Sequence, residues 1–182
     1  KMLDARYGVR PGSSLVREIP FGIRVPAAIP ERRMDSEVRV LFVGRLEARK
    51  GFDVLAEAIP HVLHDNPHVR FWIAGEGDAS DRVVREVKDL ARKNPGRIEL
   101  FGWVDDARRD ELYATCDVFV APSRYESFGL VYLEAMTRAK ACVACEAGGA
   151  MRIVIGGETG HVVPPGDGSA LAEAILVLAR DR

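Results

Sequence analysis

The sequence predicts an α/β protein with an open, mainly parallel β-sheet and helices on both faces. Short runs rich in Val, Ile and Phe alternate along the chain with longer segments whose apolar residues recur at helical spacing, and this alternation is typical of parallel strands joined by helices. The 182 residues, 47% hydrophobic and 29% charged, suit a soluble globular protein with a sizeable core. We therefore predict one domain over residues 1–182.

The strands are predicted from short β-rich runs. They lie at 16–19, 38–43, 70–74, 98–101, 117–121, 141–145 and 161–163. Segment 24–36 carries two prolines and mixed charge, and we expect a surface loop there.

Apolar stripes at helical spacing predict helices over 53–64, 81–93 and 167–180. These stripes indicate packing rather than cofactor binding. Pro60 should kink the first helix or leave one backbone carbonyl without a donor. Another helix is expected to begin at Ser127 or Phe128, with Ser127 as its N-cap.

Several classes of protein are disfavoured by composition. No window approaches the roughly 18 unbroken apolar residues of a membrane span, and the first residues lack the apolar stretch of a secretory signal. We expect a cytoplasmic protein, and the lack of an initial methionine suggests a piece of a longer chain. A net charge of −1 argues against nucleic acid as a partner.

The cysteines are predicted to lie in the core, and the histidines to have surface or packing roles. Cys116, Cys142 and Cys145 are an odd number in apolar stretches, which fits small hydrophobes in a reducing compartment. Cys142 and Cys145 have Cys-x-x-Cys spacing, but a structural zinc site needs four ligands and no second pair exists. Surface or packing roles are expected for the scattered histidines, His61, His64, His68 and His161.

The segment GRLEARKG, residues 44–51, is a candidate anion site. It follows a predicted strand at the edge where open α/β sheets bind ligands, and it offers Arg45, Arg49 and Lys50 between two glycines. It is not a Walker loop, because Lys50 precedes its glycine and no hydroxyl residue follows. On local evidence alone, a solvated basic turn is the stronger alternative.

The segment GEGDAS, residues 75–80, resembles a dinucleotide-binding turn only superficially. Glu76 and Asp78 would repel a pyrophosphate, so we expect a flexible loop near a ligand instead.

The segment SRYESFGLVYLEAM, residues 123–136, is a second candidate anion site. The free amides at the start of a helix attract phosphate, and Gly129 would let it approach them closely. Glu126, before the helix, and Glu134, two turns inside it, could each accept hydrogen bonds from sugar hydroxyls. The alternative is that both are ordinary helix-terminal and surface residues.

Together, GRLEARKG, PSRYESFGLVYLEAM and GETGHVVPPGD resemble the carboxyl-terminal half of retaining glycosyltransferases of the GT-B fold. In this order and spacing the motifs are specific, and the likeness covers nearly the whole chain. The resemblance implies one Rossmann-like half of a GT-B fold, which binds a nucleoside-diphosphate sugar such as a UDP- or GDP-hexose.

The resemblance also implies roles for individual residues. Arg45 and Lys50 would hold the diphosphate and neutralise the charge that builds on it, and Glu126 would face the sugar, so these are the catalytic candidates. Glu134 would hold the ribose hydroxyls. The remaining donor-binding candidates are loop and helix-terminal residues, namely Gly44, Trp103, Val104, Phe128, Gly129, Leu130 and Val131.

The family needs no metal, which agrees with the lack of an Asp-x-Asp motif in this chain. Three positions depart from its usual pattern. Ala139 and Ala141 stand where Gly and Pro are usual, and Arg152 stands where Glu is usual. These changes bear on efficiency and choice of sugar more than on nucleotide binding.

The resemblance implies a two-domain enzyme that transfers a hexose, with retention, to a hydroxyl of a glycan, lipid or polysaccharide. The acceptor would bind mainly to an amino-terminal domain absent from this chain, so the chain alone should be nearly inactive, and the parent enzyme could sit peripherally at a membrane. Two alternatives stay open: a non-catalytic module that binds a nucleotide or partner, and a nucleotide-sugar epimerase or hydrolase.

Overall fold

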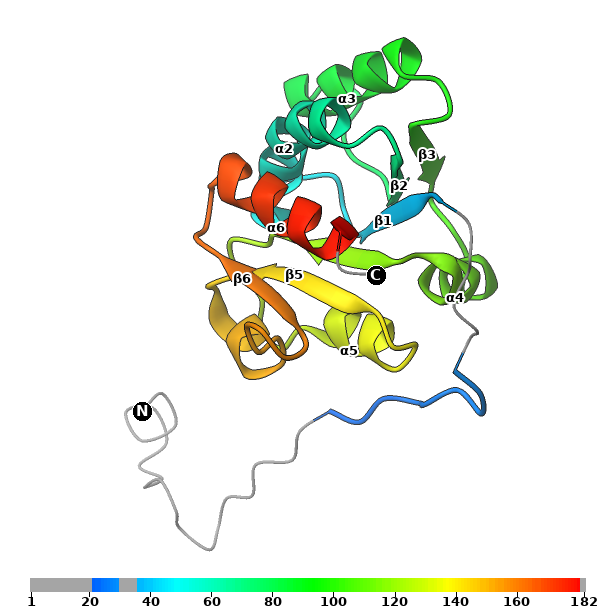
Figure 1. Ribbon diagram of the computed structural model, residues 1–182, viewed down its shortest axis with the longest axis vertical. Coiled ribbons are helices and arrows are strands. Elements are labelled where there is room, and N and C mark those ends of the chain that lie inside the picture. Colours follow the sequence, from blue (N-terminus) through cyan, green and yellow to red (C-terminus); the bar gives the residue numbers. More distant parts are fainter. Residues whose placement is uncertain (1–20, 30–35, 181–182) are drawn as a thin grey trace, which may run out of the picture.

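A six-stranded, all-parallel sheet forms the centre of the structure, a computed structural model that describes residues 21–29 and 36–180. The strand order is β3-β2-β1-β4-β5-β6 (Figure 1). The strands are β1 (Val38–Val43), β2 (Val69–Ala74), β3 (Ile98–Gly102), β4 (Val118–Ala121), β5 (Ala141–Cys145) and β6 (Gly160–Val163). The predicted parallel sheet is confirmed, while the predicted strand at 16–19 lies outside the described residues.

Helices cover both faces of the sheet, as predicted (Figure 1). On one face lie α2 (Phe52–Asp65), α3 (Arg82–Lys93) and α6 (Gly168–Arg180), and on the other α4 (Asp106–Thr115) and α5 (Leu130–Met136). Successive side chains of a strand point to opposite faces, so Val40 and Phe42 join the first layer and Leu41 joins the second. Each face therefore has its own hydrophobic core.

Helix α2 agrees with the prediction, and helix α4 differs from it. Helix α2 continues through Pro60 to Asp65, so the proline removes one hydrogen-bond donor without ending the helix. Helix α4 was not predicted, because only Leu112 and Tyr113 of its ten residues are buried and its apolar stripe is short. The signal that could have revealed it is Asp105, whose carboxylate accepts a hydrogen bond from the Arg108 amide at 2.8 Å as an N-cap.

The strand order reverses between β1 and β4. After β1 the chain builds β2 and β3 on one side, and then crosses back to build β4, β5 and β6 on the other. The loops that leave the carboxyl ends of β1 and β4 consequently diverge to opposite faces of the sheet, and such a switch point is where open α/β sheets bind ligands.

Ala139 adopts a backbone conformation that favours glycine. Its φ angle is 56°, and among the described residues it is the sole non-glycine with positive φ. It ends the turn that leads from α5 into β5. Alanine at position 139, where the family usually has glycine, thus places a Cβ in a left-handed backbone conformation. This lowers the free energy of unfolding by about 1 kcal/mol.

We expect Ala139→Gly to stabilise the protein. Relief of the left-handed strain should raise the free energy of unfolding by about 0.5–1 kcal/mol, or a melting temperature by about 2–4 °C. Thermal unfolding measures the shift. Ala107→Gly is the matched control, because Ala107 is an exposed helical residue of α4 and glycine there should destabilise by up to about 1 kcal/mol. A loss of stability in Ala139→Gly would contradict the account.

Candidate functional site

The loop after β1 presents Lys50 to the switch point. It ends in a short 3-10 helix, η1 (Ala48–Lys50), which Gly51 closes with a φ of 72°. A Cβ on Gly51 would stand 1.8 Å from the carbonyl oxygen of Pro122. Only glycine therefore allows the loop after β1 to approach the loop after β4 this closely.

Lys50 and Glu126 form an ion pair across these two loops. The Lys50 Nζ donates to Glu126 Oε2 at 2.9 Å, and their side chains are 23% and 14% exposed. The structure thus brings together two of the three catalytic candidates predicted from the sequence. The pair leaves the lysine charge compensated while no anion is bound.

A second ion pair joins the loop after β4 to the start of α2, three residues beyond Lys50. Arg124 donates to both carboxylate oxygens of Asp53, at 2.6 and 2.7 Å, and also to the Ala48 carbonyl at 2.6 Å. Partial burial by itself raises the pKa of Asp53, but the hydrogen bond and charge of Arg124 outweigh it and hold that pKa below its usual value. The carboxylate is therefore charged at neutral pH.

Helix α5 begins later than predicted, at Leu130. Its N-cap is Gly129, with a φ of 96°, and no side chain caps the helix, so the predicted cap at Ser127 is wrong. The left-handed Gly129 turns the chain into the helix axis two residues beyond Ser127. In consequence α5 has seven residues, and Glu134 lies in its second turn rather than two turns inside it.

A cavity of about 230 Å³ lies between the carboxyl ends of β1 and β4. Four of the predicted donor-binding residues line it, namely Gly44, Lys50, Val131 and Glu134. Sequence reasoning missed two further polar residues in its lining, Arg109 and Ser123. Ser123 is only 2% exposed, and Arg109 comes from α4, the helix that the sequence analysis did not find.

Two buried polar groups near the smaller cavity lack hydrogen-bond partners. The Arg109 Nε and the Tyr113 hydroxyl are buried and make no hydrogen bond of good geometry. Burial first, and then the charge of nearby Glu134, raise the pKa of Tyr113 well above its ordinary value. The phenol therefore stays protonated beside the glutamate.

A larger cavity of about 590 Å³ opens on the other side of Glu126. Its lining comes from the loop after β4 and from η2 (Gly148–Arg152), and it comprises Tyr125, Glu126, Ser127, Phe128, Gly148, Gly149, Arg152 and Ile153. A Cβ on Gly148 would stand 2.2 Å from the Glu126 carbonyl oxygen, so the two segments touch. Lys50 lines the smaller cavity and Glu126 the larger, and their ion pair marks the boundary between the two.

Other predicted residues stand apart from the smaller cavity. The Arg45 side chain is 67% exposed and its guanidinium lies 3.3 Å from Glu47. Trp103 is 71% exposed and Leu130 is 39% exposed, while Val104 packs against the core under α4 and α5. Arg45 would have to turn inward to reach a ligand beside Lys50.

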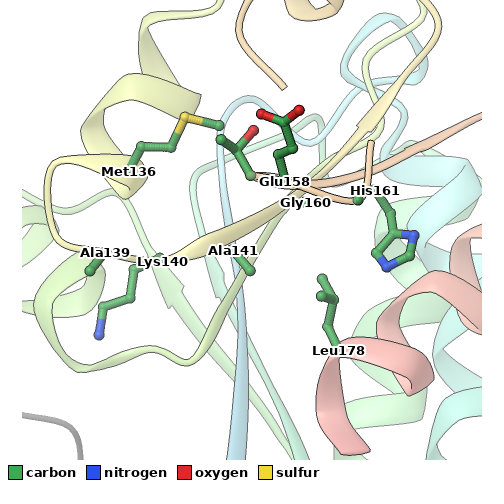
Figure 2. A pocket seen from close by; sticks show the side chains of 10 residues that line it. Met136, Ala139, Lys140, Ala141, Glu158, Gly160, His161 and Leu178 are labelled. Carbon is green, nitrogen blue, oxygen red and sulfur yellow. The ribbon is translucent and has the colours of Figure 1, made fainter. Parts of the chain in front are cut away.

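A third cavity, of about 450 Å³, lies at the opposite, amino end of β5 and β6. Its lining includes Ala139, Lys140, Glu158 and His161. Figure 2 shows that the Lys140, Glu158 and His161 side chains point in different directions rather than converging on one point. The cavity therefore lacks the convergent charges that distinguish the switch point.

The cysteines are buried and three of the four histidines lie at the surface, as predicted. Cys116, Cys142 and Cys145 are free thiols in the core, and burial raises the pKa of Cys116 to about 12 and that of Cys145 to about 11. His61, His64 and His68 are exposed, and His161 is half-buried. Of the helices in the described part of the chain, none is long and apolar enough to cross a membrane.

We predict that Glu126→Gln tightens the binding of inorganic pyrophosphate. The neutral amide no longer compensates Lys50, and an ion pair at this depth is worth on the order of 1 kcal/mol, so affinity should rise about three- to ten-fold. Calorimetric titration measures it. Glu99→Gln, on an exposed residue of β3, is the matched control and should change nothing. Weaker binding by Glu126→Gln would show that the carboxylate supports the anion instead of competing with it.

Comparisons with known proteins found relatives of this chain. Residues 37–181 match the model of the family described as glycosyl transferases group 1. A phosphatidyl-myo-inositol mannosyltransferase of Mycobacterium leprae is 36% identical over 176 residues, which cover 93% of this chain and 46% of the relative. The chain thus spans about half the length of the curated relatives it matches.

Solved structures show the same fold. HepE from Anabaena, crystallised with UDP-glucose, is 30% identical, with a TM-score of 0.69 over 80% of this chain and 40% of that one. The carboxyl-terminal domain of a group 1 glycosyltransferase, LpcC from Francisella tularensis, is 26% identical, with a TM-score of 0.70 over 79% of this chain and 76% of that one. The chain belongs to the glycosyl transferases group 1 family, and its fold is that of one half of a GT-B glycosyltransferase.

Proposed function

We propose that this chain binds the nucleoside-diphosphate sugar donor of a hexosyltransferase. The observation that carries the proposal is the Lys50–Glu126 ion pair at the boundary of two cavities, because it places a cation for the diphosphate beside a carboxylate for the sugar. We propose a UDP- or GDP-hexose as the donor class. The HepE structure with UDP-glucose supports UDP as the nucleotide, and the mannosyltransferase relatives support transfer of a hexose.

The donor would lie along the carboxyl ends of the strands. We place the ribose against Glu134 and the diphosphate against Lys50, both in the smaller cavity, with Arg45 and the amides of Gly129, Leu130 and Val131 completing the phosphate cradle. The hexose then occupies the larger cavity beside Glu126 and Phe128. The backbone at Trp103 and Val104 holds the base.

Lys50 changes partner during the proposed reaction. In the free protein it neutralises Glu126, and on donor binding it turns to the diphosphate, where it stabilises the negative charge that develops as the glycosidic bond breaks. Release from Lys50 leaves Glu126 able to accept hydrogen bonds from the sugar. We propose retention through attack on the same face, guided by the leaving phosphate, and we assign neither glutamate as a nucleophile.

The whole enzyme would transfer the hexose to a hydroxyl of a glycan, lipid or polysaccharide bound by a further domain. The relatives' length, about twice that of this chain, supports such a domain. We place the enzyme in the cytoplasm, where free buried thiols persist, and with a lipid acceptor it would contact the membrane peripherally. The proposed chemistry needs no metal, because Lys50 and Arg45 supply the positive charge.

One observation favours a second candidate, a non-catalytic module that binds a nucleotide or partner protein. Arg152 lines the larger cavity beside Glu126, and the resemblance leads one to expect a glutamate there. A cation at that place alters the charge that a donor sugar meets. Sugar transfer by the parent enzyme, or its absence, distinguishes the two candidates.

We predict that one of UDP, GDP and ADP binds the chain and that Lys50→Ala weakens it about ten- to a hundred-fold, the loss expected for a charge-assisted hydrogen bond. Calorimetric titration is the measurement. The control is Lys140→Ala, because Lys140 lies by the cavity at the opposite end of the sheet. Equal losses in both variants, or binding unaffected by Lys50→Ala, would contradict the placement of the diphosphate.

Metal removal gives a separate prediction. We expect transfer by the parent enzyme to be unchanged by EDTA, because the proposed charge neutralisation comes from Lys50 and Arg45. Initial rates with and without chelator measure this. Loss of activity that Mg²⁺ or Mn²⁺ restores would show that a cation shares the diphosphate.

A further inference from the structure

The residues that would touch the donor come from two separate loops. Lys50 lies at the end of η1, after β1, and Glu126 lies in the loop after β4. The two are 76 positions apart in the sequence. The distance between the Lys50 and Glu126 side chains therefore depends on the contacts that hold the two loops together.

Arg124, in the loop after β4, contacts both η1 and Asp53 at the start of α2. The Arg124 guanidinium bonds both oxygens of Asp53, a bidentate geometry that restricts orientation as well as distance, and it also reaches the Ala48 carbonyl. The backbone adds a hydrogen bond from the Arg124 amide to the Arg49 carbonyl at 3.1 Å. One residue thus binds the loop of Lys50 at three points along residues 48–53.

We call the Asp53–Arg124 ion pair the clasp, and it lies beside the two cavities without lining either of them. Arg124 and Asp53 are absent from the linings of both cavities at the switch point. Arg124 is two residues from Glu126, and Asp53 is three residues from Lys50. Asp53 also stands in the first turn of α2, where the helix dipole favours its negative charge.

We propose that the Asp53–Arg124 clasp is a positioning device that holds Lys50 and Glu126 in register. Its importance for donor binding rests on the function proposed above, but its effect on the Lys50–Glu126 pair does not. When the clasp is broken, the loop after β4 is held to η1 mainly by backbone contacts, and Lys50 loses its fixed partner.

Lysine acetylation tests the clasp without any ligand. The 182-residue chain is treated briefly with acetic anhydride, and the extent of reaction at each lysine is read by mass spectrometry. In Arg124→Gln and in Asp53→Asn, Lys50 should react about three- to ten-fold faster, because an amine released from a partly buried ion pair is more accessible. Lys88, Lys93 and Lys140 serve as internal references.

Two further variants separate positioning from general damage. Arg92→Gln breaks an exposed ion pair with Asp89 on α3 and should leave Lys50 unchanged. The charge swap Asp53→Arg with Arg124→Asp restores opposite charges and should recover part of the wild-type protection. Circular dichroism confirms that each variant is folded, and Asp53→Asn keeps the test valid if Arg124→Gln does not fold.

Titration with inorganic pyrophosphate completes the experiment. Arg124→Gln should weaken binding about ten-fold in the wild-type background, because Lys50 is then no longer held at the site, whereas in Glu126→Gln the intact clasp still holds it there. The loss should be less than about two-fold when Lys50 is already Ala, because the clasp acts through Lys50. Unchanged Lys50 acetylation in both clasp variants overturns the proposal. Faster acetylation in a chain that binds no pyrophosphate upholds the clasp and refutes the proposed function instead.

Discussion

The site is organised by the half-buried ion pair between Lys50 and Glu126. Two charges of opposite sign can lie this far from water only if each compensates the other. Each belongs to a loop that leaves the carboxyl end of a central strand, β1 or β4, and these strands are neighbours only because the sheet order reverses there. The topology thus creates the crevice, and the ion pair defines what kind of ligand it favours: one with an anionic part and a hydroxyl-rich part.

Backbone segments pack closely together around the Lys50–Glu126 ion pair. Gly51 lets the loop after β1 meet the Pro122 carbonyl, and Gly148 lets η2 meet the Glu126 carbonyl. The Tyr132 hydroxyl donates to the Ala121 carbonyl at 2.5 Å and so anchors α5, a helix too short to be stable alone, to the end of β4. These contacts and the Asp53–Arg124 clasp hold the segment from the end of β4 to Glu126 against its neighbours. A preorganised site loses less free energy on binding its ligand.

Most of the fold could be predicted from the sequence because its strands are strongly apolar and its main helices carry regular stripes. Helix α4 could not, since its single buried turn at Leu112 and Tyr113 gives almost no periodic signal. The pairing of Lys50 with Glu126 could not be predicted either, because the two residues are 76 positions apart and only the folded chain brings them together. The start of α5 was misplaced because Ser127 satisfies cap preferences, while the left-handed Gly129 in fact sets the helix. Arg109 was not predicted as a cavity residue because it lies in α4, which was itself not predicted.

The most direct test is a crystal structure of the chain with the nucleoside diphosphate that binds it. We expect a phosphate oxygen within hydrogen-bonding distance of the Lys50 ammonium group, the ribose hydroxyls on Glu134, and the Glu126 carboxylate released toward the larger cavity. A nucleotide bound elsewhere, with the Lys50–Glu126 pair intact, would contradict this expectation.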